Sequence, residues 1–261
     1  RKELDAVFFF EHLDVDSRGI KWFKKKYKPS RLIKILDKWQ NALDFPANYL
    51  ENHDQVRSVN HFGNIGKYWE KSAKLLCGLN LSLRGIPFIY EGEEIGMTNA
   101  HFDKLEKYKD VELFNILKEK ENNLLYKALI KDKTAFEVSR DNARTPMQWN
   151  SDKYAGFSIQ KPWIDVNENK NEINVEKSLV DDDSILNFYK KIIKIRKENK
   201  IIKDGTYLDL LPKNKNIFFY KRYIDDEEIY VIASFVRKII SCKHLNKIRN
   251  FELMLSNYKK E

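Results

Sequence analysis

The chain contains 261 residues, 42% of them hydrophobic and 33% charged, so it can bury a sizeable core. This composition excludes a disordered tail, a coiled coil and a collagen-like chain. Lys and Arg outnumber Asp and Glu by 48 to 39, for a formal net charge of +9. Because basic and acidic residues are interspersed, and no nucleic-acid motif accompanies the densest basic stretch, residues 21–28, we expect a solvated lysine-rich surface and no nucleic-acid partner.

The most apolar stretch, residues 73–90, is interrupted by Asn80 and Arg84. It is therefore too short for the roughly 20 apolar residues of a membrane helix, and we expect a soluble protein with no membrane partner. The two cysteines, Cys77 and Cys242, show no Cys/His spacing typical of zinc. Their small number favours a reducing, cytoplasmic location.

The N-terminal part of the chain alternates between strand-like and helix-like segments. The predicted strands are residues 6–10, 48–50 and 88–90, and the predicted helices between them are residues 30–43 and 68–79. Ser30 is the predicted N-cap of the first helix. The alternation is typical of a parallel α/β fold.

A long excursion, residues 97–181, follows and includes a charged helical stretch at 105–125. A connecting segment of this length more often carries a function than merely joins two elements. Ser184 then caps a predicted helix, and alternating strands with an Asp225-Asp226 hairpin turn follow it. These strands are predicted at residues 217–223, 229–235 and 251–255. We predict two domains, an α/β domain at 1–200 and a small antiparallel β domain at 201–261.

Polar residues follow each of the three predicted parallel strands: Glu11 and His12, then residues 51–55, then residues 91–94. In parallel α/β barrels, the carboxyl ends of the strands carry the active site. Carboxylates without a metal-ligand set, an arginine-rich loop and many aromatic residues suit carbohydrate chemistry. Glycoside cleavage needs one carboxylic acid and one carboxylate, so we expect neither metal nor cofactor.

Three longer motifs resemble the α-amylase superfamily. They are Glu51-Asn52-His53-Asp54-Gln55, the run from Pro87 to Asn99 and the run from Arg140 to Trp149. The phrases at 155–157 and 161–163 fit its branch of oligo-1,6-glucosidases, α-glucosidases and trehalose-6-phosphate hydrolases. The resemblance covers nearly the whole chain. It implies the C-terminal part of a (β/α)8 barrel of a retaining glucosidase, followed by a small, incomplete antiparallel β domain.

By this resemblance Asp54 is the third catalytic carboxylate, which grips the 2- and 3-hydroxyls of the sugar, and His53 hydrogen-bonds the same sugar. Physical chemistry supports both assignments. A carboxylate that accepts two hydroxyl protons strengthens its hold as charge develops at the anomeric carbon, and a neighbouring histidine can donate to the same edge.

The resemblance also implies two arginines at the sugar. Arg140 would reach the 4-hydroxyl side of a bound glucose, because a guanidinium keeps its charge and holds its donors in one plane. Arg144 would either contact the sugar or buttress the loop through Asp141. Glu112 and Gln55 match positions in the next subsite. Glu91, Glu93 and Glu94 are implied to support the last barrel loop rather than to catalyse.

The family places the nucleophile after the fourth strand and the general acid after the fifth, whereas the strands predicted here correspond to the sixth to eighth. Glu11 and Asp14 follow the sixth strand and do not replace them. The chain also begins at Arg1 without a secretory signal. We therefore predict a fragment that is inactive alone and that exposes a strand edge prone to aggregation.

The expected function is part of an α-glucosidase that cleaves terminal glucose from short α-linked oligosaccharides by double displacement. One alternative is a trehalose-6-phosphate hydrolase, which needs cations for a dianion that residues 21–28 could supply. Another is a carbohydrate-binding protein that has lost catalysis. Linkage preference and oligomeric state stay open.

Overall fold

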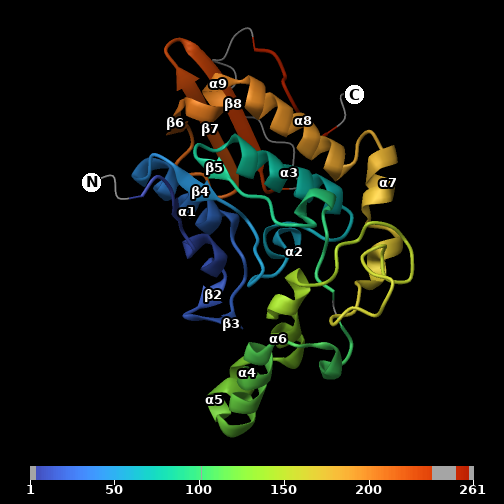
Figure 1. Ribbon diagram of the computed structural model, residues 1–261. Helices are drawn as coiled ribbons and strands as arrows, with labels where there is room; N and C mark the ends of the chain where they lie inside the picture. The colour runs from blue at the N-terminus through green and yellow to red at the C-terminus, as the bar shows by residue number, and fades with distance from the viewer. Residues whose placement is uncertain (1–3, 101, 237–250, 259–261) are drawn as a thin grey trace.

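The computed structural model describes residues 4–100, 102–236 and 251–258 (Figure 1). Its first sheet is parallel, with the strand order β1-β4-β5. These strands are β1 (Val7–Phe8), β4 (Pro46–Asn48) and β5 (Ile86–Pro87). The connections contain η1 (Glu11–Asp14), β2 (Ser17–Arg18), β3 (Ile20–Lys24), α1 (Pro29–Ala42), α2 (Ser58–Phe62) and α3 (Trp69–Ser82). The predicted strand–helix alternation is confirmed.

The parallel strands are shorter than predicted, and two of them end early. The residues predicted as strands at 48–50 and 88–90 lie mostly beyond the paired segments, which end at Asn48 and Pro87. Apolar runs report burial, whereas a strand also needs a ladder partner at each position. Ser30 is not the N-cap of α1 either. The helix begins at Pro29, whose fixed φ suits a first helical turn, and Lys28 occupies the cap position.

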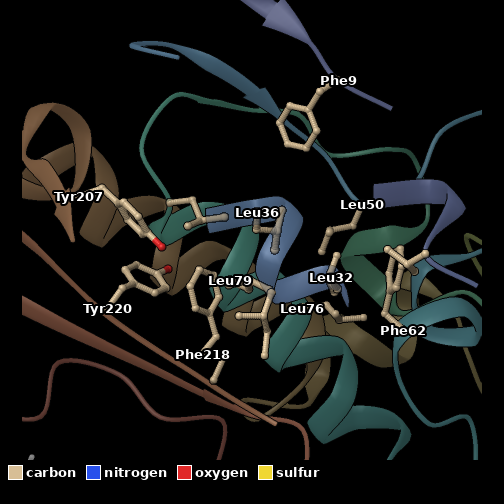
Figure 2. Close-up of a cluster of buried hydrophobic side chains, with 14 residues drawn as sticks. Phe9, Leu32, Leu36, Leu50, Phe62, Leu76, Leu79, Tyr207, Phe218 and Tyr220 are labelled. Atoms are coloured by element: carbon tan, nitrogen blue, oxygen red, sulfur yellow. The ribbon is translucent and has the colours of Figure 1, made fainter. Parts of the chain in front are cut away.

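Helices α1 and α3 pack together beneath the C-terminal sheet. Figure 2 shows Leu32 and Leu36 of α1 facing Leu76 and Leu79 of α3, with Phe218 of β7 beside them. All five side chains are at most 3% exposed. The apolar spacing of three and four residues on both helices produces these facing stripes. One core thus joins the parallel part of the chain to the β sheet.

The excursion forms a run of short helices, and α4 and α5 project at the lower end of the molecule in Figure 1. The element η2 (Glu93–Ile95) precedes the excursion, whose helices are η3 (Leu105–Lys107), α4 (Val111–Asn122), α5 (Leu124–Leu129), α6 (Asp132–Val138), η4 (Arg140–Ala143), η5 (Glu168–Asn171) and α7 (Val175–Val180). The stretch predicted as helical at 105–125 is therefore not continuous. The Asp110 and Asn123 side chains each cap a new helix and so divide it.

The C-terminal part begins with α8 (Ile185–Glu198) and α9 (Lys200–Asp204). As predicted, Ser184 caps α8, accepting a hydrogen bond from the Asn187 amide at 3.1 Å. An antiparallel sheet follows, formed by β6 (Thr206–Asp209), β7 (Ile217–Ile224) and β8 (Glu227–Ser234). The predicted Asp225-Asp226 turn joins β7 to β8, and Asp225 has a φ of 50°. Asp tolerates this left-handed conformation better than most residues.

The third predicted strand of this domain, residues 251–255, is wrong. Residues 251–258 form no strand. The end of this segment lies against α3 instead, where Asn257 Nδ2 donates to the Lys71 carbonyl at 2.9 Å. Alternating hydrophobicity supplies no ladder partner by itself. Cys77 is free and buried, whereas Cys242 lies outside the described residues. Within the described ranges, no helix is long and apolar enough to cross a membrane.

Candidate functional site

Asp54 lies in the loop that follows β4, at the carboxyl edge of the parallel sheet. Three side chains contact its carboxylate. Arg144 Nη2 is 2.8 Å and Arg140 Nη1 3.4 Å from Asp54 Oδ1. His53 Nε2 is 3.2 Å from Asp54 Oδ2. The structure thus brings together four of the predicted site residues, and the Asp54 side chain remains 49% exposed, so its carboxylate can still meet a ligand.

Arg144 fixes the loop that carries Asp54. Its Nε donates to the His53 carbonyl at 2.8 Å. Asp141 serves another segment, since its Oδ2 accepts hydrogen bonds from the Lys109 and Asp110 amides at 2.6 and 2.9 Å. Arg144 therefore buttresses the Asp54 loop directly, and its guanidinium faces the same carboxylate oxygen as Arg140.

Glu112 and Gln55, the two residues predicted for the next subsite, make other contacts. Glu112 lies in the first turn of α4 and forms an ion pair with Lys21 at 2.5 Å. Its negative charge also contributes to the raised pKa of Arg140. Gln55 follows Asp54 and is partly buried, and its backbone amide donates to the Asn52 carbonyl at 3.2 Å. Neither residue joins the contacts around Asp54 described above.

Sequence reasoning missed Asp110, which pairs with a different nitrogen of Arg140 from the one that Asp54 contacts. Its fully buried carboxylate has Oδ1 at 3.0 Å from Arg140 Nε. Desolvation acts to lower the pKa of Arg140, but the charges of Asp110 and Asp54 outweigh it, and the net effect is a raised pKa. The available signal was an Asp directly before an apolar-periodic helix, the usual mark of an N-cap.

A buried ion pair anchors the start of the same loop. Glu51 Oε1 and Arg57 Nη1 are 3.0 Å apart, and both side chains are 1% exposed. The other Glu51 oxygen accepts the Ser58 amide, and Arg57 Nη1 also donates to the Glu91 carbonyl at 2.6 Å. Because these contacts tie Glu51 to Arg57 and Ser58 at the far end of the segment, residues 51–58 are held firmly around Asp54.

Glu93 is a structural residue, in line with the role that the family resemblance implied. Its Oε1 accepts the Tyr189 hydroxyl at 2.9 Å and its Oε2 accepts the Tyr90 amide at 3.2 Å. Burial, together with the nearby charge of Glu51, raises the pKa of Glu93 to about 8. Across the described part of the chain, no group of three or more His, Cys, Asp or Glu side chains could hold a metal ion.

A carboxylate, a histidine and two arginines gathered at the carboxyl edge of parallel strands are the arrangement typical of the active-site face of a parallel α/β barrel. The comparisons with known proteins agree. The α-amylase catalytic domain matches residues 1–205. The chain belongs to this family.

Curated relatives match nearly the whole chain. The oligo-1,6-glucosidase of Bacillus cereus is 42% identical, covering 99% of this chain and 47% of the relative. The trehalose-6-phosphate hydrolase of Escherichia coli is 38% identical, covering 98% of this chain and 47% of the relative. The chain thus spans about half the length of these relatives.

Solved structures show the same partial match. The trehalose-6-phosphate hydrolase of Bacillus licheniformis superposes with a TM-score of 0.82 at 42% identity, covering 89% of this chain and 43% of that one. An isomaltulose synthase mutant from Erwinia rhapontici, in complex with sucrose, gives 0.84 at 34% identity, covering 91% and 44%. The fold is therefore part of a (β/α)8 barrel followed by a small antiparallel β domain.

Proposed function

We propose that this chain forms the sugar-gripping part of a retaining α-glucosidase that removes terminal glucose from short α-linked oligosaccharides in the cytoplasm. The observation that carries the proposal is the Asp54 carboxylate, half exposed and flanked by His53, Arg140 and Arg144. Such a carboxylate can accept two neighbouring sugar hydroxyls while the guanidiniums donate to a third. Binding at the 2-hydroxyl strengthens as the sugar ring approaches the oxocarbenium-like transition state.

Asp54 needs two further carboxylates to complete the chemistry. The nearby acidic residues after β1 are engaged elsewhere: Glu11 Oε2 lies 2.7 Å from Lys38 Nζ, and Asp14 Oδ1 accepts the Ser17 hydroxyl at 3.2 Å. We propose that the nucleophile and the general acid belong to the part of the family architecture that this chain does not match. The 261 residues alone would then be a fragment without hydrolytic activity.

The test combines this chain with the missing part of the enzyme. The portion of the Bacillus cereus relative that this chain does not match is fused upstream, and hydrolysis of a nitrophenyl α-glucoside is measured. We expect activity from the fusion, none from the 261 residues alone, and a loss of at least about a thousandfold with Asp54→Asn. Hydrolysis by the isolated chain that Asp54→Asn abolishes would refute the assignment of the missing carboxylates.

A trehalose-6-phosphate hydrolase is the second candidate, and one contact favours it. Lys21 Nζ pairs with Glu112 at the position that the resemblance assigns to the next subsite. A phosphate there would compete with Glu112 for the Lys21 ammonium. Comparing trehalose with trehalose 6-phosphate as substrates of the fusion separates the two activities, because only the phosphohydrolase requires the phosphate.

A carbohydrate-binding protein without catalysis would keep the same Asp54 cluster. Isothermal titration of the 261 residues with glucose or maltose distinguishes it. A binding module shows measurable affinity alone, whereas a partial enzyme shows none. Retention on heparin that falls steeply with salt would instead indicate a nucleic-acid partner.

A further inference from the structure

Arg140 is held by two carboxylates of different character. Asp54 is 49% exposed, and its Oδ1 lies 3.4 Å from Arg140 Nη1. Asp110 is fully buried, and its Oδ1 lies 3.0 Å from Arg140 Nε. Because a buried carboxylate cannot reorient toward solvent, Asp110 is the fixed support and Asp54 is the exposed partner.

The Asp110 carboxylate also holds the backbone on both sides of it. Oδ2 accepts the Ser139 hydroxyl at 2.9 Å and the Arg140 amide at 3.1 Å. Oδ1 accepts the Glu112 amide at 3.0 Å and so caps α4. One buried side chain thus links the segment that carries Arg140 to the helix start that carries Glu112.

The link is reciprocal. Asp110 accepts from the backbone amide of Arg140, while Asp141 accepts from the backbone amide of Asp110 at 2.9 Å. In each of the two segments, one carboxylate therefore accepts a hydrogen bond from a backbone amide of the other segment. Charge-assisted bonds of this kind are stronger than neutral ones and define orientation.

We propose that Asp110 is a positioning residue that aims the Arg140 guanidinium at the sugar beside Asp54. This inference rests on the proposed function and adds to it a residue that contacts no substrate. Asp110 forms an ion pair with the buried Arg140 Nε and accepts a hydrogen bond from the Arg140 backbone amide, so the guanidinium meets the terminal sugar without first losing conformational freedom. The same carboxylate, through the cap of α4, sets the distance from Arg140 to Glu112.

The test uses Asp110→Asn, in which the amide keeps one acceptor for the α4 cap and removes the charge. Arginine Nε–H exchange is followed by NMR on the full 261 residues, and the Arg140 signal is assigned by its loss in Arg140→Lys. We expect the exchange to accelerate about tenfold or more at Arg140. The Asn123→Ala control removes the cap of neighbouring α5 and should leave the Arg140 rate unchanged.

An unchanged Arg140 rate in Asp110→Asn overturns the proposal, as does an equal acceleration in Asn123→Ala. If Asp110→Asn does not fold, Ser139→Ala removes a single donor to the same carboxylate and is measured in the same way. Faster exchange at Arg140 then supports the proposal, and an unchanged rate contradicts it.

In the active fusion, Asp110→Asn should raise KM about tenfold with kcat changed far less, because the loss lies in holding the sugar. A drop in kcat at constant KM would contradict the positioning role. If the fusion proves inactive, the proposed function fails while the NMR experiment still decides the role of Asp110.

Discussion

The two sheets of this molecule have similar aromatic sequences, but the parallel sheet exposes its rings and the antiparallel sheet buries them. In the parallel sheet and the residues that follow its strands, Phe8, Phe10 and Phe88 are 48%, 60% and 43% exposed. In the antiparallel sheet, Phe218 and Phe219 are 0% exposed. Phe8 packs on Phe88 with ring centroids 4.7 Å apart, so the exposed rings form a patch. Patches of this kind mark surfaces that need a partner.

The difference lies in which faces the rest of the chain covers. β7 lies between β6 and β8, and α1 and α3 pack against its inner face. Within the described residues, β1 and β5 pair on one side only, with β4. An aromatic strand sequence therefore indicates rings suited to burial, and the position of the strand in the sheet decides whether this chain covers them.

The largest predicted effect comes from truncating the buried ring. Phe218→Ala should lower the free energy of unfolding by about 3–5 kcal/mol, because it leaves a cavity in a closed core. The matched change Phe8→Ala should cost less than about 1 kcal/mol, since that ring is already half exposed. Urea denaturation of both variants measures the contrast, and equal losses would show that the two sheets do not differ as described.

The next prediction concerns pH and the buried Glu93, which follows the last strand of the parallel sheet. The pKa of Glu93 is raised from 4.5 to about 8 in the folded chain. The protonated form therefore contributes stability that is fully present below pH 4.5 and is lost as the pH rises through 8. Glu93→Gln should remove part of the stability loss between about pH 6 and pH 9.

Urea midpoints at both pH values test this prediction, with Glu91→Gln as the control because Glu91 is exposed. The Glu91 variant should follow the unmodified chain across the whole range. If Glu93→Gln loses as much stability between about pH 6 and pH 9 as the unmodified chain does, Glu93 is already ionised at neutral pH.

The smallest effect on stability is expected from Phe10→Ser. Because this ring is 60% exposed, the free energy of unfolding should change by no more than about 0.5 kcal/mol. Self-association should fall, since the apolar patch is interrupted. Sedimentation velocity over a concentration series measures self-association. If it does not fall, another surface of the chain is responsible for the association.

The sequence predicted elements wherever the signal was local. Helical spacing in α1, α3 and α8, the Ser184 cap and the Asp225-Asp226 turn all follow from neighbouring residues. It failed where a partner decides the structure. Residues 251–255 alternate like a strand but form none, and the stretch at 105–125 is divided by two capping side chains.

The site divides in the same way. By itself, the sequence determined the family and the motifs that carry Asp54, Arg140 and Arg144, because these are contiguous runs of residue types. Only the tertiary structure decided that segments 86 to 90 residues apart meet at one carboxylate, and that buried Asp110 supports Arg140. The physical reason is that burial and charge pairing depend on distance in space, which hydrophobic patterning along the chain does not encode.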